Sequence, residues 1–326
     1  MSGLRVAVLY GGRSGEHEVS LRSAEAVMDA LRRKGYRVAP YFIGRDGRWH
    51  PAPILPVPGA NPDIDVVFPV LHGTFGEDGT VQGLLEMAAL PYVGAGVFAS
   101  AAAMDKDLFK RLCRERGLPV VEYVTLSARA LDAAALMRRF PFPVFVKPAN
   151  LGSSVGIHKA HNAAELEAAL ADAARYDTKV LVERAITGLE LECAVLGNDD
   201  PVASTPCQII PSREFYDYED KYILDRARAV IPAEAPPEIL REVQRLAVEC
   251  YRAVGCTGMG RVDFLLESAT GKVFINELNT IPGFTSISMY PSMWAYHGLP
   301  LPELVARLVD LALARFRERQ SLRYER

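Results

Sequence analysis

The chain has 326 residues, of which 49% are hydrophobic and 24% charged, as is usual for a globular protein of two or three domains. Its net charge of −3 gives no reason to expect a nucleic-acid partner, so any phosphate binding must be local. The sequence shows no signal-peptide pattern and no apolar run approaching the roughly 18 residues of a membrane span. Its five cysteines form no Cys-x-x-Cys pair. We therefore expect a cytoplasmic protein with reduced thiols and no membrane partner.

Strand and helix patterns alternate over the first part of the chain. Strands are predicted at 4–10, 37–43 and 66–71, and helices at 20–34 and 80–88. This alternation predicts a parallel sheet, whose ligands gather beyond the carboxyl ends of the strands. Glu16 follows one strand end and is our candidate to hold an ammonium group; a helix-terminal charge favoured by the helix dipole is the alternative. His72 follows another strand end and is predicted, at most, to position a substrate.

A lysine and a loop of small residues follow the next predicted strand. Residues 143–148 read Pro-Val-Phe-Val-Lys-Pro, and residues 149–156 read Ala-Asn-Leu-Gly-Ser-Ser-Val-Gly. Backbone N–H groups in such a loop can approach a phosphate closely. The loop alone is a weak signal and is commonly a plain turn. Together with Lys147 at the strand end, it predicts a phosphate clamp.

The later elements change from alternating to antiparallel. Asn162 followed by Glu165 predicts a capping box at the start of a helix. The strands at 191–196 and 202–210 follow one another without a helix between them and should be antiparallel. Residues 212–229 are too polar and aromatic for a core strand, and a loop of this length predicts a lid. The other predicted elements are a strand at 179–183 and helices at 104–117, 163–176, 237–254 and 302–319.

Residues 259–279 predict a β-hairpin. Two apolar, β-prone runs are separated by Ser-Ala-Thr-Gly at 268–271, which is turn composition. The simplest register, with 268 opposite 272, pairs Leu265 with Ile275, Asp263 with Glu277 and Arg261 with Asn279. The side chains of Asp263, Glu277, Arg261 and Asn279 would then share one face of the hairpin.

Opposed carboxylates in this hairpin predict a cation site. Opposed Cβ atoms are about 5 Å apart, and two anions this close are costly unless a cation lies between them. Asp263, Glu277 and Asn279 offer the hard oxygen ligands that Mg²⁺ prefers. The alternative is a solvated edge hairpin with ordinary charges, and a one-residue bulge would change the register.

In this order, the motifs resemble those of bacterial D-alanine:D-alanine ligases of the ATP-grasp superfamily. Besides the lysine clamp and the hairpin, the resemblance rests on Gly-Glu-His-Glu-Val-Ser at 15–20, Leu-His-Gly at 71–73, Gly-Glu-Asp-Gly at 76–79, Tyr-Asp-Tyr-Glu-Asp-Lys-Tyr at 216–222 and Pro-Gly-Phe-Thr at 282–285. It extends from residue 4 to about residue 313. It implies a three-domain ATP-grasp fold of mixed α/β and α+β type. The implied parts are an N-terminal parallel α/β sheet domain at 1–103, a central subdomain at 104–186 and a C-terminal subdomain with metal site and lid at 187–326.

The resemblance implies an ATP site between the second and third domains. Lys106 and Lys147 would contact the phosphates, which would be covered by a loop with Gly152, Ser153, Ser154 and Val155. Adenine would be bordered by Glu183, Arg184 and Ile186, and ribose would be held by Glu190. The site would also include Asn276 and Glu277. Two Mg²⁺ ions, which Mn²⁺ could replace, would be held by Asp263, Glu277 and Asn279. Arg184 stands where many relatives have lysine; because its backbone would contact adenine, little consequence is expected.

The resemblance also implies a reaction. ATP would phosphorylate a first D-alanine, and the amine of a second would attack the acyl phosphate. Glu16 would hold the first ammonium, while Arg261 and the Gly283 N–H would stabilise the oxyanion. Lys221 and Ser288 would bind the carboxylate of the second D-alanine. Tyr222 and Ser153 would close the pocket around Glu16. His72 and Met289 would form part of the pocket wall. The family also suggests a homodimer.

Three other functions are weighed against this one. D-alanine:D-lactate and D-alanine:D-serine ligases would use the same ATP machinery, but they lack this Tyr-rich lid pattern. A non-catalytic nucleotide sensor should have lost metal ligands, and none is missing. A dehydrogenase needs Gly-x-Gly-x-x-Gly, whereas residues 11–18 read Gly-Gly-Arg-Ser-Gly-Glu-His-Glu.

Overall fold

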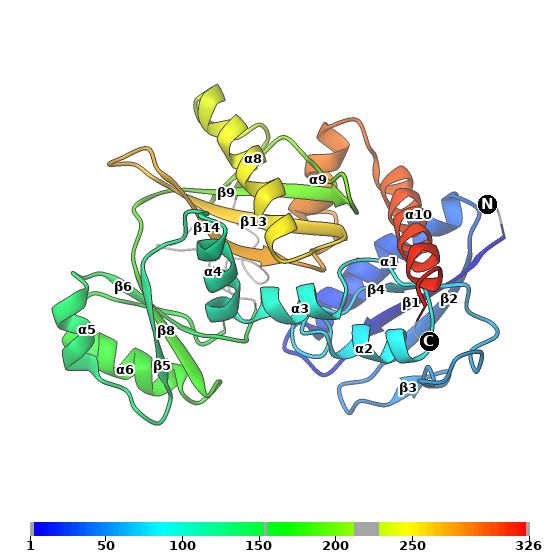
Figure 1. The fold of residues 1–326 in the computed structure, drawn as a ribbon, viewed down its shortest axis with the longest axis horizontal. Coiled ribbons are helices and arrows are strands. Elements are labelled where there is room, and N and C mark those ends of the chain that lie inside the picture. Colours follow the sequence, from blue (N-terminus) through cyan, green and yellow to red (C-terminus); the bar gives the residue numbers. More distant parts are fainter. Residues whose placement is uncertain (1–2, 153–154, 212–227, 324–326) are drawn as a thin grey trace.

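Three β-sheets follow one another along the chain in the computed structural model, which describes residues 3–152, 155–211 and 228–323 (Figure 1). The first sheet has the order β3-β2-β1-β4. Its strands are β1 (Arg5–Gly11), β2 (Arg37–Ile43), β3 (Trp49–His50) and β4 (Val66–Pro69). β1 pairs in parallel with both β2 and β4, which confirms the predicted parallel sheet, and the short β3 is an antiparallel edge strand.

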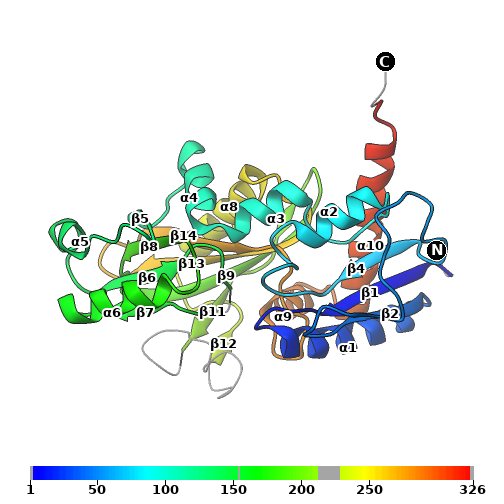
Figure 2. The same ribbon diagram turned by 90° about the horizontal axis from the view of Figure 1, so that it is seen from below.

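Helices cover both faces of the first sheet because successive residues of β1 point to opposite sides. Val6 and Val8 join a core with α1 (His17–Arg33) and α10 (Leu301–Gln320). Ala7 and Leu9 join another core with α2 (Thr80–Met87). Figure 2 shows α1 and α2 on opposite sides of this sheet. The last helix of the chain therefore packs on the first sheet.

The second sheet is antiparallel, with the order β5-β8-β6-β7. Its strands are β5 (Tyr123–Ser127), β6 (Val144–Pro148), β7 (His158–Ala160) and β8 (Lys179–Arg184). Val146 and Val182 share a core with α5 (Ala133–Arg139) and α6 (Ala163–Ala173), which cover one face. Lys147 and Glu183 occupy the alternate positions of their strands, so they lie on the other face.

Side-chain caps begin two of the predicted helices. Asn162 accepts a hydrogen bond from the Glu165 N–H at 3.0 Å, at the start of α6 as the capping box predicts. Asp105 accepts from two backbone N–H groups in the first turn of α4 (Lys106–Glu115). Such caps typically stabilise a helix by about 1 kcal/mol. The cap fixes the position of Lys106, the first residue of α4.

The third sheet has the order β12-β11-β9-β13-β14, with β10 paired to β9. Its strands are β9 (Gly188–Gly197), β10 (Val202–Ala203), β11 (Cys207–Ile210), β12 (Arg228–Val230), β13 (Gly258–Glu267) and β14 (Val273–Asn279), and α8 (Pro237–Ala253) shares their core. The antiparallel pairing is confirmed. The prediction of one strand at 202–210 is wrong, because β10 and β11 divide it. Residues 228–229, predicted as the end of the lid, belong to β12, and the rest of the lid lies outside the described residues.

The hairpin register agrees with the prediction at its functional end and differs near the turn. Leu265 pairs with Phe274, so the predicted pairing with Ile275 is wrong, as is the pairing of 268 with 272. A bulge then shifts the register between Asp263 and Phe264, with Asn276 as the extra residue. The two one-residue offsets cancel. The predicted pairs are therefore present: Asp263 with Glu277, and Arg261 with Asn279.

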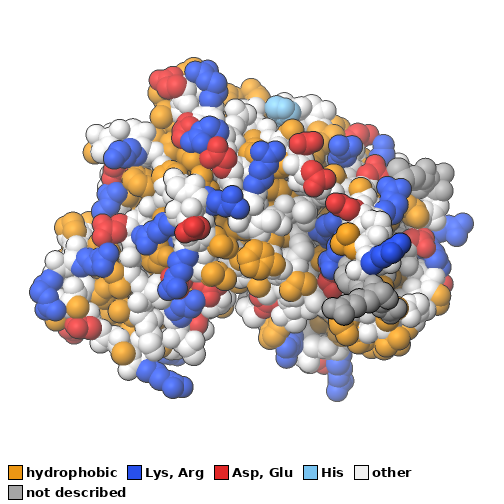
Figure 3. All heavy atoms as spheres, in the orientation of Figure 1, with side chains coloured by type: hydrophobic (Ala, Val, Ile, Leu, Met, Phe, Trp, Pro, Cys, Tyr) orange, Lys and Arg blue, Asp and Glu red, His pale blue; other side chains and the backbone are white. Residues whose placement is uncertain are grey.

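Two shorter helices join the parts: α3 (Val97–Met104) leads into α4, and α9 (Met289–Tyr296) precedes α10. In Figure 3, a hollow at the lower edge of the molecule separates the part that carries α5 and α6 from the rest. Acidic and basic side chains are interspersed over the face shown in this figure. All five cysteines are free thiols, as predicted. No helix in the described part of the chain is long and apolar enough to cross a membrane.

Candidate active site

Two cavities meet at the end of the hairpin. The N-terminal cavity is lined by these predicted residues: Glu16, His72, Arg261, Asn279, Gly283, Ser288 and Met289. The central cavity, between the second and third sheets, is lined by these: Lys147, Glu183, Arg184, Ile186, Glu190, Asp263 and Asn276. Lys106, Gly152 and Glu277 line both cavities. A ligand in one cavity can therefore contact a ligand in the other.

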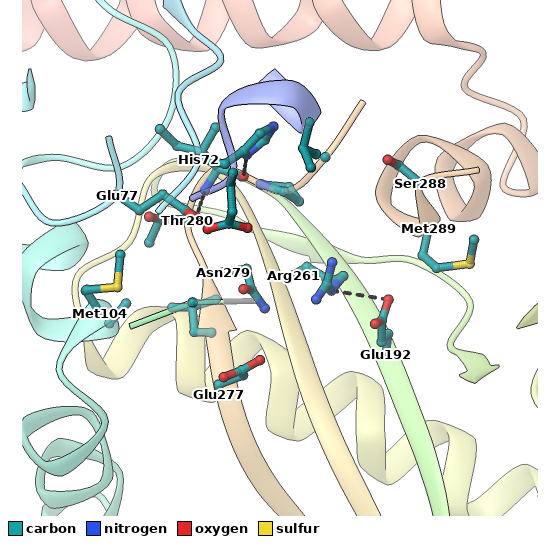
Figure 4. A pocket seen from close by; sticks show the side chains of 18 of the residues that line it. His72, Glu77, Met104, Glu192, Arg261, Glu277, Asn279, Thr280, Ser288 and Met289 are labelled. Carbon is teal, nitrogen blue, oxygen red and sulfur yellow. Dashed lines mark hydrogen bonds and ion pairs between the residues drawn. The ribbon is translucent and has the colours of Figure 1, made fainter. Parts of the chain in front are cut away.

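Arg261 is held between carboxylates of two strands, and Figure 4 shows its contact with one of them, Glu192. Its guanidinium donates two hydrogen bonds of 2.7 Å to Asp263, and its Nε lies 3.2 Å from a carboxylate oxygen of Glu192 on β9. Burial disfavours the charge of Arg261, but Asp263 and Glu192 raise its pKa well above the ordinary value. Arg261 is thus a fixed cation at the cavity wall. Sequence reasoning missed Glu192, which reaches this cluster only because β9 pairs with β13.

The predicted metal ligands suit a hard cation in kind. Asp263 and Glu277 are opposed, and the Asn279 amide donates to Asp263 at 3.0 Å, which leaves its own carbonyl oxygen as an acceptor. Asp263 also accepts hydrogen bonds from Arg261, but a carboxylate has about four lone-pair positions and can bind both the guanidinium and a metal ion. The described residues contain no group of three or more His, Cys, Asp or Glu side chains arranged to hold a metal ion. A metal site here would therefore need the asparagine amide as a ligand, and the metal-binding role of these three residues stays a prediction.

Glu16 lies against two glycines from distant parts of the chain. A Cβ atom on Gly73 would be 2.5 Å from its carboxylate oxygen, and one on Gly152 would be 2.9 Å away. A larger residue at either position would therefore require the Glu16 carboxylate to move. The first glycine follows His72, and the second belongs to the predicted phosphate clamp. The structure therefore brings the clamp loop to the candidate ammonium-binding residue.

His72 is buried and cross-links the N-terminal part to the loop after the hairpin. Its Nδ1 donates to the carbonyl oxygen of Ile281 at 2.9 Å, and its Nε2 lies 3.2 Å from the Ser23 hydroxyl. Burial lowers the pKa of His72, so the neutral ring is favoured near pH 7. A neutral, fixed ring suits the predicted positioning role better than proton transfer.

Glu77 was not predicted as a site residue, although it belongs to the Gly-Glu-Asp-Gly motif at 76–79. It accepts backbone hydrogen bonds from Gly73 at 2.8 Å and Ile281 at 3.0 Å. Burial and the charge of Glu16 raise the pKa of Glu77 to about 8. Its position among these side chains appears in Figure 4. The motif marked Glu77 in the sequence, but a motif alone does not predict whether a side chain is buried.

Gly283 and Ser288 form the far wall of the N-terminal cavity. The Ser288 hydroxyl accepts from the Thr285 N–H at 3.0 Å. A Cβ atom on Gly283 would be 2.7 Å from this hydroxyl oxygen, so a larger residue here would displace the Ser288 side chain. Met289 begins α9 at the edge of the same wall. These residues line the same cavity, and the roles that the resemblance implies for them stay predictions.

Lysines line the central cavity. Lys147 is 2.7 Å from a Glu183 carboxylate oxygen and donates to the Asn276 side chain at 3.3 Å. Lys106 donates to the Leu151 carbonyl oxygen at 2.6 Å. Both lysines are therefore anchored beside the clamp loop. Glu183, expected beside adenine, is buried with its side chain toward the lysines rather than toward water.

Four predicted residues lie outside the described part of the chain: Ser153, Ser154, Lys221 and Tyr222. Val155 is described, and its N–H donates to the Gly152 carbonyl oxygen at 3.2 Å. The roles given to the four residues stay predictions.

Comparison with known proteins agrees with this arrangement. A family model described as D-ala D-ala ligase N-terminus matches this chain in two segments, residues 5–61 and 55–95. A second model, described as D-ala D-ala ligase C-terminus, matches residues 112–310. A D-alanine–D-alanine ligase from Solibacter usitatus is 62% identical over 323 residues, which are 99% of this chain and 99% of that protein. The solved ligase from Coxiella burnetii has a TM-score of 0.88 and 38% identity, covering 98% of this chain and 97% of that one.

A second solved structure is similar as well. The D-Ala:D-Ser ligase VanG from Enterococcus faecalis has a TM-score of 0.85 and 35% identity, covering 95% of this chain and all of that one. The three sheets and two adjoining cavities thus define an ATP-grasp enzyme. More narrowly, the chain belongs to the D-alanine–D-alanine ligase family.

Proposed function

We propose that this protein joins two D-alanine molecules with ATP to give D-alanyl-D-alanine, the product needed for peptidoglycan precursors. The observation that carries the proposal is the junction of the two cavities at Lys106, Gly152 and Glu277. A nucleotide in the central cavity would place its terminal phosphate where an amino acid in the N-terminal cavity can receive it. The 62% identity to a D-alanine–D-alanine ligase supports this substrate pair.

The first step is phosphoryl transfer. A carboxylate oxygen of the first D-alanine bonds to the terminal phosphorus of ATP, the bond to the bridging oxygen breaks, and ADP leaves. Glu16 holds the ammonium of this D-alanine, beside the glycine of the clamp loop. Lys106 and Lys147 neutralise the phosphate charge during transfer.

The second step forms the amide. The amine of the second D-alanine, once deprotonated, attacks the acyl carbon, and phosphate leaves. Arg261 and the Gly283 N–H stabilise the oxyanion, and removal of one such contact typically costs about 3 to 4 kcal/mol. Ser288 with Lys221 holds the second carboxylate, while Tyr222 and Ser153 close the pocket. Exclusion of water protects the acyl phosphate from hydrolysis.

Mg²⁺ is proposed as the metal, with two ions at Asp263, Glu277 and Asn279 and with Mn²⁺ as a substitute. When bound, Mg²⁺ supplies charge neutralisation for the phosphate oxygens. We also propose a cytoplasmic homodimer that needs no nucleic acid. The fold divides into the parts 1–103, 104–186 and 187–326 in this proposal, with ATP between the last two.

The test measures phosphate release from ATP with and without D-alanine and identifies the product by mass. D-alanine-dependent release with a dipeptide product is expected. Equimolar D-serine and D-lactate should be offered as competing acceptors, because a D-Ala:D-Ser ligase shares the fold. D-alanyl-D-alanine as a minor product would overturn the choice of acceptor, and ATP turnover independent of D-alanine would overturn the ligase assignment.

A further inference from the structure

Glu192 completes a row of three carboxylates across adjacent strands. Asp263 on β13 pairs with Glu277 on β14 at one side and with Glu192 on β9 at the other. Opposed residues of neighbouring strands point to the same face of a sheet, so the three carboxylates lie side by side. Glu192 is buried and lines both cavities. The proposed reaction gives roles to Asp263 and Glu277 but none to Glu192.

The guanidinium of Arg261 is fixed from two directions. Asp263, two residues along the same strand, accepts hydrogen bonds of 2.7 Å from Nε and Nη2. Glu192 approaches Nε to 3.2 Å from the neighbouring strand, and Figure 4 shows its carboxylate facing the guanidinium. The hydrogen bonds that Arg261 donates within the described part of the chain use Nε and Nη2, which leaves Nη1 for the oxyanion.

Asp263 has a second proposed role, which weakens its hold on Arg261. It is a proposed Mg²⁺ ligand, and it also accepts from the Asn279 amide at 3.0 Å. A metal ion at Asp263 repels the guanidinium, because like charges a few ångströms apart interact unfavourably. Glu192 is not one of the proposed metal ligands. Its charge therefore stays with Arg261 when the charge of Asp263 is shared with a metal.

The amide-forming step depends on where this guanidinium points. A donor stabilises an oxyanion at a distance of about 3 Å, and a displacement of about 1 Å can cost about a hundredfold in rate. An arginine side chain has many rotamers, and ordering them during the reaction would be costly. Contacts from two strands order them beforehand. Phosphoryl transfer relies instead on the lysines and the proposed metal, so it depends less on the orientation of Arg261.

We propose that Glu192 is a positioning residue that keeps Arg261 aligned with the oxyanion while Asp263 binds the metal. The proposal rests on the two-step reaction of the proposed function. Glu192 acts through Arg261 rather than through a contact with substrate. Removal of its charge therefore slows amide formation and leaves phosphoryl transfer nearly intact.

The test follows both steps in the first turnover of the full-length protein by rapid chemical quench. Glu192→Gln keeps the size of the side chain and removes its charge. The rate of D-alanyl-D-alanine formation should fall about tenfold or more, because Arg261 is less well aligned, whereas the rate of ADP formation should stay within about threefold of the wild-type value. The ratio of the two rates is a property of the folded molecules, so a loss of stability does not obscure it. Equal falls in both rates, or an unaltered rate of dipeptide formation, would overturn the proposal.

Two further variants separate positioning from structure. Glu267→Gln removes the charge of another carboxylate in the same sheet, which pairs with Arg184 at 2.6 Å at the last residue of β13, and should leave the ratio of the two rates unchanged. Arg261→Lys should lower the rate of dipeptide formation by itself, and Glu192→Gln added to it should lower that rate no further. An equal additional fall in the double variant, or a similar fall in Glu267→Gln, would count against a role that acts through Arg261.

Thermal unfolding without substrates tests whether Glu192 belongs to the metal site instead. The wild type and Glu192→Gln are unfolded over a range of Mg²⁺ concentrations. The concentration that gives half of the rise in Tm should agree within about fivefold between them, because Glu192 is not a proposed ligand. A difference well beyond this range would assign Glu192 to the metal and refute the positioning role. Failure of the wild type to form a dipeptide would instead overturn the proposed function.

Discussion

Two buried charge clusters flank the point where the cavities meet, and they carry opposite net charge. The hairpin cluster sets one guanidinium, Arg261, against the carboxylates of Glu192, Asp263 and Glu277. The lysine cluster sets two ammonium groups, Lys110 and Lys147, against Glu183 alone. Among the side chains just named, the first cluster has more carboxylates than cations, which suits a bound cation. The second has positive charge in excess and favours a bound anion.

This difference gives the junction a polarity suited to phosphoryl transfer. A nucleotide phosphate carries negative charge and needs both cations on the protein and metal ions beside it. The lysine cluster supplies the former, and the hairpin cluster offers oxygen ligands for the latter. A change of charge in one cluster should therefore affect metal and nucleotide differently from a change in the other.

The largest effect is expected in the hairpin cluster. Glu277→Gln keeps the side-chain volume and removes one charge, so turnover should fall about a hundredfold or more and the Mg²⁺ concentration for half activity should rise. The variant should still fold, because the amide keeps the shape of the carboxylate. Steady-state kinetics over a Mg²⁺ titration, with thermal unfolding of the metal-free protein, provide the measurement. Near-normal turnover would contradict the metal assignment.

A smaller and more selective effect is expected at Glu16. Its carboxylate lies beside the clamp loop but belongs to neither cluster. Glu16→Gln should raise KM for the first D-alanine about tenfold or more, as for loss of a contact to a charged group, while KM for ATP changes little. Initial rates at varied D-alanine and varied ATP separate the two constants. Equal changes in both would point to a structural role for Glu16.

Glu77 should give a change in the pH dependence of stability. Its folded pKa of about 8 exceeds the ordinary carboxyl value of 4.5, so the folded state keeps a proton that the unfolded chain releases between these values. Stability from this group is therefore greatest below pH 4.5 and falls as pH rises toward 8. At about 1.4 kcal/mol for each pKa unit, the loss is at most about 5 kcal/mol.

The variant Glu77→Gln removes this titration. One backbone hydrogen bond should be lost at every pH, so the variant should be less stable than the wild type at pH 5. The difference should shrink as pH rises to 9, because only the wild type loses its proton. Denaturant unfolding at several pH values measures the difference in free energy of unfolding. A difference independent of pH would show that the carboxyl of Glu77 ionises normally.

Local sequence pattern predicted the opposed pairs of the hairpin cluster but not the whole cluster. Alternation of side chains and a short turn place Asp263 opposite Glu277, and this result held even though the turn and the bulge each moved the register by one residue. That agreement was partly fortunate, since nothing in the sequence marks Asn276 as a bulge. Glu192 was missed because its approach depends on pairing between β9 and β13, which are distant in sequence.

The lysine cluster could not be assembled from sequence. Lys110, Lys147 and Glu183 come from α4, β6 and β8, so their contact requires the packing of a helix on a sheet. The sequence predicted the helix that became α4 and a lysine at the end of a strand, but it could not predict how close the two elements would lie. For the same reason the sequence placed Glu183 beside adenine but did not predict its contacts with the two lysines. Burial of its side chain is a tertiary property.

The smallest effect is expected at Arg184, at the open edge of the lysine cluster. Its guanidinium pairs with Glu267 on β13 at 2.6 Å, but the pair is partly exposed and links two sheets at the rim of the central cavity. Exposed pairs contribute little because water and salt screen them. Arg184→Lys preserves the charge and the backbone proposed to contact adenine, so KM for ATP should stay within about fivefold of the wild-type value. Kinetics at low and high salt measure it. A larger rise in KM that salt does not alter would show that the guanidinium itself binds the nucleotide, and the comparison of clusters would then have to include Arg184 as a third cation.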